Sequence, residues 1–276
     1  MTVRQPKPSR PATKRIASRN VVAIVQARMG SSRLPGKTLV DIAGKPLLAH
    51  VVERVQASAR IERLVIATTS EADDAKILGW AAENGVPSFA GSRDDVLDRF
   101  YQAAQCAAAE IIVRITADDP FKDPDVIDAV VDELISDSQL SYASNTIVPT
   151  FPEGLDVEAF RFSALARAWR EARLASDREH VTPYIWRNPA LFFLKNIRYQ
   201  EDLSSLRWTL DYEEDLEFTR RIYSRLYRGR IFKMQQILDL LREEPELARI
   251  NSGVPRNAGY LLSLQREQQA GSRSSA

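Results

Sequence analysis

A regular alternation of short apolar runs and amphipathic segments is the feature that most restricts how this chain can fold. The first run, NVVAIVQA at 20–27, is rich in β-branched residues and leads into a glycine-containing loop, and apolar residues at helical spacing follow at 45–58. Strands and helices that alternate across short loops form a parallel sheet covered by helices on both faces. We therefore predict an α/β fold with a mostly parallel sheet.

The predicted elements divide the chain into a regular first part and a less regular second part. Up to residue 137 we expect strands at 20–27, 63–69, 86–91 and 111–117, and helices at 45–58, 71–85, 94–110 and 123–137. After residue 140 we expect strands within 140–146, 154–160, 191–197 and 206–210, and helices at 163–174 and 213–227. The second part of the sheet is therefore predicted to be mixed. Ligands of such sheets bind at the carboxyl ends of the strands.

Composition predicts the boundaries of the folded part. Residues 1–19 contain basic residues, three prolines and no acid. Such a segment buries too little apolar surface to fold, so we expect a disordered basic tail, with an arm for nucleic acid or an anionic surface as the alternative. Residues 20–245 contain no linker or repeat, and we expect them to form a single domain. Residues 246–276 are predicted to be a C-terminal extension whose end, REQQAGSRSSA, is disordered.

Charge and cysteine content restrict the partners and the compartment. The formal net charge is +1, which gives no global field to attract nucleic acid or a membrane surface. The sequence lacks an apolar run of the roughly 18 residues that a membrane-spanning helix needs. The single cysteine, Cys106, cannot form an internal disulfide, which is typical of the reducing cytoplasm. We expect a cytoplasmic protein with neither nucleic acid nor membrane as a partner.

The loop QARMGSSRLPGKT (26–38) concentrates positive charge at the end of the first predicted strand. Arg28, Arg33 and Lys37 suit the oxygens of a triphosphate or of departing pyrophosphate. Small residues that can leave their N–H groups free for an anion accompany them: Gly30, Ser31, Ser32 and Gly36. A Walker A loop would need four residues between its first glycine and Gly-Lys-Thr, and this loop has five. A solvated basic turn is the simpler alternative.

Two acidic segments also follow predicted strands. Asp118 and Asp119, in ITADDPFKDP (115–124), are placed to emerge at the same sheet edge as the basic loop, where paired carboxylates suit Mg²⁺. The same sequence is also common at a helix start. Asp211 follows the run at 206–210, and on its own it is better explained as an acid at a helix N-terminus than as a metal ligand.

The whole series of motifs resembles the cytidylyltransferase family that activates acidic sugars, which includes the acylneuraminate and KDO (3-deoxy-manno-octulosonate) cytidylyltransferases. The similarity is greatest to the SpsF-like branch, named for spore coat polysaccharide biosynthesis. The motifs are VVAIVQARMGSSRLPGKTLVDIAGKPLL, GSRDDVLDRFYQAA, VRITADDPFKDPDVID, YASNT, PEGLDVEAF and DREHVTPYIW, in this order over roughly residues 20–220. The resemblance implies a Rossmann-like nucleotidyltransferase fold of the GT-A type.

The resemblance also implies roles for individual residues. Arg28, Arg33 and Lys37 match the positions that hold the nucleotide phosphates, and Asp118 and Asp211 match the two metal-binding aspartates, for Mg²⁺ or Mn²⁺. Further residues match the nucleotide loop (Gln26, Ala27, Gly30, Ser31, Ser32, Gly36) or the acceptor side (Glu158, Arg178, Glu179, His180).

Two departures from the family pattern stand out. Gln26-Ala27-Arg28 replaces Pro-Ala-Arg, and Ala117-Asp118-Asp119-Pro120 replaces the branch's Gly-Asp-Cys-Pro, which leaves the role of Asp119 open. For His180, a structural role and a catalytic role are equally compatible with the sequence.

The implied reaction is the transfer of CMP from CTP to an acidic sugar or a sugar-phosphate-like acceptor, with release of pyrophosphate. An acceptor oxygen would attack the α-phosphorus in line, and catalysis would rest on positioning and electrostatics. Two alternatives remain open: a glycosyltransferase that uses a nucleotide sugar, and a non-catalytic relative that only binds nucleotides.

A cluster of aromatic residues between 140 and 197 bears on assembly. Its members are Phe151, Phe160, Phe162, Trp169, Tyr184, Trp186, Phe192 and Phe193. Exposed together, they would exceed the apolar patch that a soluble monomer tolerates. Since related sugar cytidylyltransferases are commonly dimers, we predict a homodimer through this segment. The alternative is that these aromatics enlarge the core of one monomer.

Overall fold

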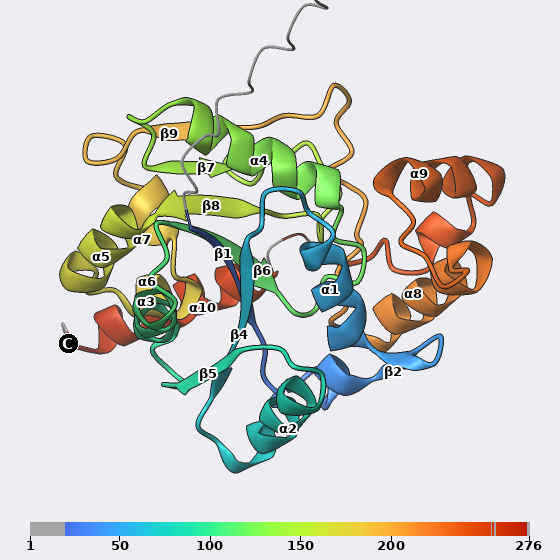
Figure 1. Ribbon diagram of the computed structural model, residues 1–276, viewed down its shortest axis with the longest axis horizontal. Coiled ribbons are helices and arrows are strands. Elements are labelled where there is room, and N and C mark those ends of the chain that lie inside the picture. Colours follow the sequence, from blue (N-terminus) through green and yellow to red (C-terminus); the bar gives the residue numbers. More distant parts are fainter. Residues whose placement is uncertain (1–19, 255, 257, 275–276) are drawn as a thin grey trace, which may run out of the picture.

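The structure is a computed structural model that describes residues 20–254, 256 and 258–274. The predicted basic tail, 1–19, lies outside the described residues, as do 275 and 276 at the other end. A central seven-stranded sheet organises the rest (Figure 1). Its strand order is β5-β4-β1-β6-β8-β7-β9.

The sheet is parallel in the first part of the chain and mixed in the second. Strands β5 (Ser88–Gly91), β4 (Arg63–Thr69), β1 (Val21–Gln26) and β6 (Ile111–Thr116) are parallel neighbours. Strand β8 (Glu158–Arg161) pairs antiparallel with β6 and with β7 (Tyr142–Ser144), and β9 (Leu194–Asn196) pairs parallel with β7. A small hairpin, β2 (Asp41–Ile42) and β3 (Lys45–Pro46), lies outside this sheet. The predicted fold class is confirmed.

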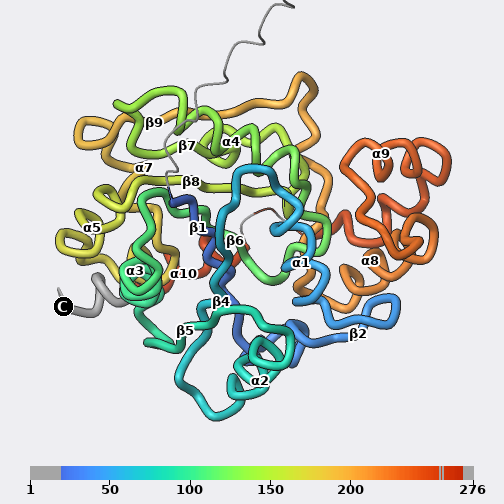
Figure 2. The backbone as a smooth tube through the Cα atoms, viewed as in Figure 1, coloured from blue at the N-terminus to red at the C-terminus, as the bar shows by residue number. Residues whose placement is uncertain are grey.

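The helices cover both faces of the sheet, as the backbone in Figure 2 shows. They are α1 (Leu47–Gln56), α2 (Ala75–Glu83), α3 (Val96–Cys106), α4 (Pro124–Ser136), α5 (Phe162–Glu171), α6 (Ala175–His180), α7 (Pro183–Trp186), α8 (Glu213–Leu226), α9 (Met234–Glu243) and α10 (Ala258–Ser274). Short 3₁₀ turns lie at Lys37–Leu39, Ala72–Asp74 and Leu247–Arg249. None of the helices in the described ranges has both the length and the apolar character needed to span a bilayer.

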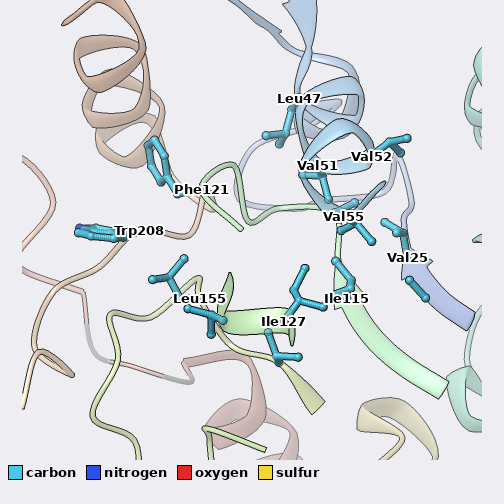
Figure 3. Close-up of a cluster of buried hydrophobic side chains, with 14 of the residues drawn as sticks. Val25, Leu47, Val51, Val52, Val55, Ile115, Phe121, Ile127, Leu155 and Trp208 are labelled. Atoms are coloured by element: carbon cyan, nitrogen blue, oxygen red, sulfur yellow. The ribbon is translucent and has the colours of Figure 1, made fainter. Parts of the chain in front are cut away.

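The core consists of two clusters because successive side chains of a strand point to opposite faces. Val21, Ala23 and Val25 of β1 belong to one cluster, and Val22 and Ile24 belong to the other. The first cluster receives α1, α4, α8 and α9, and the second receives α3 and α5. Figure 3 shows part of the first cluster, in which Val51 and Val55 of α1 lie near Ile115 of β6.

Local sequence signals explain where several helices begin. The Asp123 carboxylate accepts from the N–H of Asp125 at 2.9 Å, and Pro124 occupies the first helical position of α4. At the start of α3 the Asp95 carboxylate accepts from the N–H of Asp98 at 2.8 Å. Both caps hold loops at the carboxyl edge of the sheet, where the site lies.

The strand predicted at 206–210 is wrong. The N–H of Trp208 donates to the carbonyl of Glu153, and the N–H of Leu210 donates to the carbonyl of Asp118. Because the backbone bonds of this segment go to two different partners, only an isolated bridge between Glu153 and Arg207 forms. Gly154 makes the close approach possible, since a Cβ on it would lie 2.6 Å from the backbone of Trp208.

Most of the aromatic cluster at 140–197 lies inside the monomer. Phe151, Phe160 and Phe192 are buried, and the Trp169 ring stacks on Tyr101 with 4.2 Å between centroids. Phe193 is the member that remains exposed, at 65%. These aromatics therefore enlarge the monomer core, which was the alternative to a dimer contact, and they no longer argue for the predicted homodimer.

Candidate active site

The carboxyl ends of β1 and β6 lie at the same sheet edge because the two strands are parallel neighbours. The basic loop leaves β1 at this edge, and Asp118 follows the end of β6. The N–H of Leu210 donates to the carbonyl of Asp118 over 2.8 Å, which brings Asp211 to the same place. The topology thus gathers three segments that are far apart in the sequence.

The ammonium group of Lys37 joins these segments. Its Nζ lies 2.7 Å from Asp118 Oδ2, 2.7 Å from Asp211 Oδ1 and 2.9 Å from the carbonyl of Leu210. Burial lowers the pKa of Lys37, but the two carboxylates outweigh burial and the net shift is upward. Burial raises the pKa of Asp118, and Lys37 outweighs it so that this pKa falls to about 2. Lys37 and Asp118 are therefore both charged at neutral pH.

Two arginines bind the carboxylate of Asp211, one of them partly exposed and the other buried. Arg33 of the basic loop donates to Asp211 Oδ1 at 2.6 Å, and the buried Arg207 donates to Oδ2 at 3.2 Å. Arg207 also binds Asp215 at 2.9 Å and Glu153 at 2.8 Å, and these carboxylates raise its pKa against the opposing effect of burial. The sequence analysis missed Arg207. The available signal was a charged residue inside an otherwise apolar run, four positions before Asp211.

Asp119 turns away from Asp118 and is nearly fully buried. Its carboxylate accepts from the Thr116 hydroxyl at 2.5 Å and lies 2.8 Å from Lys122 Nζ, which is also buried. Burial raises the pKa of Asp119 to about 6, against the opposing effect of Lys122. The neighbouring acids therefore differ in environment: Asp118 meets Lys37 where the clefts join, and Asp119 pairs with the buried Lys122 in the wall of the second cleft.

The small residues of the basic loop are partly occupied by the loop itself. The N–H groups of Ser31 and Gly36 donate to the carbonyl of Met29 at 2.9 and 3.3 Å, so in this structure they are not free for an anion. Gly36 has φ +74°, a conformation that favours glycine. Thr38 Oγ1 donates to the carbonyl of Arg28 and pins the loop, while the Arg28 side chain is exposed.

Two clefts meet at this sheet edge. The first has a volume of about 580 Å³ and is lined by most of the predicted nucleotide residues: Gln26, Ala27, Arg28, Ser31, Ser32, Arg33 and Lys37. The second has a volume of about 490 Å³ and extends toward Glu158 and Thr182. Asp118 and Asp211 line both clefts, as do Arg33 and His180. A substrate in each cleft would therefore meet the other at the two aspartates.

Of the four predicted acceptor residues, three line the clefts and one lies outside them. Glu158 is buried in the wall of the second cleft, where it accepts from Tyr142 Oη at 2.6 Å, from Thr182 Oγ1 at 2.5 Å and from Arg114. Glu179 lines the first cleft, and His180 lines both. Burial, assisted by Arg114, lowers the pKa of His180 to about 4, so its ring is neutral at pH 7.

Arg178 does not reach either cleft. Its Nε donates to the Asp95 carboxylate at 3.0 Å, and its Nη1 donates to the carbonyl of Trp169 at 2.7 Å. Asp95 caps α3, so Arg178 ties α6 to the start of α3. In this structure Arg178 links helices behind the clefts and does not contact a substrate position.

The first cleft also contains an arginine that the sequence analysis missed. Arg99 of α3 is 2% exposed and donates through Nη1 to the carbonyl of Ser92 at 2.6 Å. Its Nε has no hydrogen-bond partner in the described part of the chain. Burial, with a contribution from Arg28, lowers the pKa of Arg99 to about 10. A buried cation with unused hydrogen-bonding capacity favours an anionic or carbonyl-bearing ligand.

The two shared aspartates fit a divalent cation. Their oxygens lie 2.7 Å from the same Lys37 nitrogen, so they converge on a position that already holds positive charge. The described residues gather no set of three or more His, Cys, Asp or Glu side chains around one point. Mg²⁺ does not need such a set, because it keeps several waters and takes further ligands from substrate phosphates.

Comparison with known proteins identifies the class. The sequence model of the cytidylyltransferase family matches residues 22–242, and the chain belongs to this family. It is 31% identical to the spore coat polysaccharide biosynthesis protein SpsF of Bacillus subtilis over 237 residues, which are 83% of this chain and 97% of that protein. The resemblance inferred from the motifs is thereby confirmed.

Solved structures agree with the family. A cytidylyltransferase from Leptospira borgpetersenii superposes with a TM-score of 0.80 at 32% identity, covering 86% of this chain and 99% of the other. CMP:2-keto-3-deoxy-manno-octonic acid synthetase in complex with CTP superposes with a TM-score of 0.59 at 18% identity, covering 75% and 99%. The second similarity establishes a shared fold.

Proposed function

We propose that this enzyme transfers CMP from CTP to an acidic sugar or a sugar phosphate and releases pyrophosphate, for the synthesis of a surface polysaccharide or glycoconjugate. The observation that carries the proposal is the junction of the two clefts, where Lys37 bridges Asp118 and Asp211. The family supports CTP as the donor. The names of the relatives support the rest, one for polysaccharide biosynthesis and one for an acidic sugar.

In the proposed reaction CTP occupies the first cleft and the acceptor the second. An acceptor oxygen attacks the α-phosphorus, and the bond from this phosphorus to the oxygen bridging to the β-phosphate breaks. The electron pair of that bond leaves with pyrophosphate, and an attacking hydroxyl releases its proton to solvent in the open cleft. No protein nucleophile is needed, so the chain contributes position and charge.

The basic loop and the two aspartates would have different electrostatic roles in this reaction. Asp118 and Asp211 would hold Mg²⁺ or Mn²⁺, which when bound neutralises charge on the phosphates. Lys37 and Arg33 now pair with these carboxylates. With a divalent ion in their place, both side chains would be free to bind the phosphate oxygens, together with Arg28. Charge grows on pyrophosphate as it leaves, so these cations would act mainly in the transition state.

The second cleft suits a polar acceptor. Besides the two shared aspartates, Asp118 and Asp211, it contains four acids, each of which pairs with a cation of the protein: Asp119 with Lys122, Glu153 with Arg207, Asp156 with Arg256, and Glu158 with Arg114. A negatively charged acceptor therefore meets little uncompensated negative charge from this wall. Thr146, Thr182 and Thr209 add hydroxyl groups for sugar recognition.

Pyrophosphate release tests the function. Each of the four nucleoside triphosphates is mixed with Mg²⁺ and a panel of acidic sugars and sugar phosphates, and pyrophosphate is detected enzymatically. We expect release with CTP and one class of acceptor. Transfer from a preformed nucleotide sugar, without pyrophosphate, would identify a glycosyltransferase instead. Binding of CTP with no turnover across the panel would favour a non-catalytic relative.

We further propose that the protein acts in the cytoplasm as a homodimer. Exposed apolar residues cluster beside the edge strand β9, namely Ile147, Val148, Leu191 and Phe193. The carbonyl of Phe193 and the amide of Asn196 connect this edge to residues 141–148. A second copy seated on this edge would cover the patch. Sedimentation at micromolar concentration tests the dimer, and an active monomer of 31.1 kDa would contradict it.

A further inference from the structure

Helix α10 lies outside the region that defines the family and nevertheless reaches the active site. The family match ends at residue 242, and α10 begins at Ala258. The helix packs against α6, which carries Glu179 and His180 (Figure 1). Gly259 lines both clefts. The wall that α10 forms therefore lies outside the region that the family model matches.

One face of α10 is turned to the first cleft. The residues of the helix that line this cleft are Gly259, Leu262, Ser263 and Arg266. Their spacing of three, four and seven positions from Gly259 is that of a single helical face. The helix therefore contacts the cleft through one continuous face.

Polar contacts hold this face in place. The Ser263 hydroxyl donates to Glu179 Oε2 at 2.8 Å and lies 2.9 Å from His180 Nε2, and Ser176 Oγ donates to Glu267 at 3.0 Å. Leu261 and Leu262 remain 48% and 46% exposed, and the Tyr260 ring adds edge contacts to His180 and Trp186, with 5.1 and 6.0 Å between ring centroids. Polar and ring contacts together fix the helix beside the cleft, and they leave one polar side chain of its cleft-lining residues unused.

That side chain is Arg266. In the described residues it forms no ion pair or hydrogen bond, although it lines a cleft that contains four carboxylates. Lys37 and Arg33, in contrast, are engaged by Asp118 and Asp211. An exposed guanidinium that faces a cleft and leaves its donors unused is suited to paired phosphate oxygens.

We propose that Arg266 of α10 binds the phosphates of the nucleotide, so that a helix outside the family region completes the nucleotide site. The proposal rests on the proposed function, because it takes the first cleft as the site of CTP. Arg266 lines the first cleft only, and so it contributes to nucleotide affinity and leaves acceptor affinity unchanged.

Calorimetric titration of the full-length protein with CTP and Mg²⁺ tests the proposal. We expect R266A to weaken CTP binding about tenfold, the scale of one charge-assisted hydrogen bond, and R266K to recover part of the loss. R249A is the matched control, since it removes an exposed arginine of the same C-terminal region that lines neither cleft. It should stay within about twofold of wild type, as expected for an isolated surface charge.

Two further measurements make the result specific. R266A should raise the KM for CTP and leave the acceptor KM unchanged, and S263A, which cuts the link to His180 and Glu179, should weaken CTP binding by a smaller factor. Equal affinities of R266A and R249A would overturn the role of Arg266 and leave cytidylyl transfer intact. Failure of the wild-type protein to bind any nucleoside triphosphate would overturn both, and is a distinguishable result.

Discussion

The two walls of the first cleft are built in different ways. The sheet-edge wall contains the basic loop, Asp118 and Asp211, and its charges are paired with one another at 2.6 to 2.7 Å. The helical wall, α6 and α10, is linked by hydrogen bonds through Ser263 and contains a neutral His180 and an Arg266 that has no ion pair among the described residues. In the proposed reaction the cations of the first wall would be released to the phosphates when a divalent ion binds Asp118 and Asp211. The second is suited to recognising a substrate that is already charged.

Charge removal at the aspartates tests the first wall most severely. We predict that D118N and D211N each lower kcat by about 10²-fold or more, the scale of losing one electrostatic stabiliser, and that both variants stay folded. The measurement is pyrophosphate release with CTP and Mg²⁺, with a thermal melt as control. R249A again serves as the reference for a neutral change. Near-normal turnover by both folded variants would remove the metal assignment and with it the contrast between the walls.

Removal of Lys37 is expected to have opposite effects on two measurements. K37M should lower kcat more than it raises the acceptor KM, because the ammonium acts on the pyrophosphate side, and R33A should do the same more weakly. In the absence of nucleotide K37M should bind Mn²⁺ more tightly than wild type, since the competing cation between Asp118 and Asp211 is gone. Electron paramagnetic resonance of free Mn²⁺ measures this directly.

Either of two outcomes would break that prediction. An acceptor KM that rises while kcat stays constant would place Lys37 on the acceptor. Unchanged Mn²⁺ affinity would show that the metal does not use the position that Lys37 now fills. K45M is the matched control, because Lys45 also pairs with a carboxylate, that of Glu53, but lines neither cleft.

The same contrast separates what could be predicted from sequence. The sheet-edge wall follows from local patterns: β-branched strands, a loop of cations after β1, and acids after β6. Asp211 was placed at this wall by its match to a family motif. The local pattern predicted a strand before it, and the structure forms only an isolated bridge there. Arg207, which anchors it, depends on contacts with Glu153 and Asp215 that no local period reveals.

The helical wall could not be predicted in this way. Part of the stretch for which disorder was expected, 266–274, is helical, and its polar sequence gives no sign that one face meets a cleft. Arg178 shows the same limit of sequence patterns, because its motif placed it at the site and the structure does not. Its motif matched the acceptor region, but Asp95, which is 83 positions away in the sequence, and the carbonyl of Trp169 hold it behind the cleft.

The smallest predicted effect concerns protonation of the helical wall. The pKa of His180 falls from 6.5 to about 4 on folding, mainly through burial. Between these pH values the unfolded chain binds a proton that the folded chain does not bind. The contribution of His180 to the free energy of unfolding is therefore fully present above pH 6.5 and is lost as the pH falls toward 4. The pKa difference corresponds to about 3 kcal/mol, and the partial exposure of the ring reduces this to roughly 1–2 kcal/mol.

H180Q isolates this contribution because the chain has one other histidine, His50, which both proteins retain. Glutamine can still donate a hydrogen bond to Ser263, so the link between α6 and α10 is kept while the titrating group is lost. We expect urea unfolding of wild type to show a larger loss of stability between pH 7 and pH 5 than H180Q, with equal stabilities near pH 7. Parallel pH profiles would show that His180 titrates alike in the folded and unfolded chains. The helical wall would then be open to water, and its difference from the sheet-edge wall would rest on Arg266 alone.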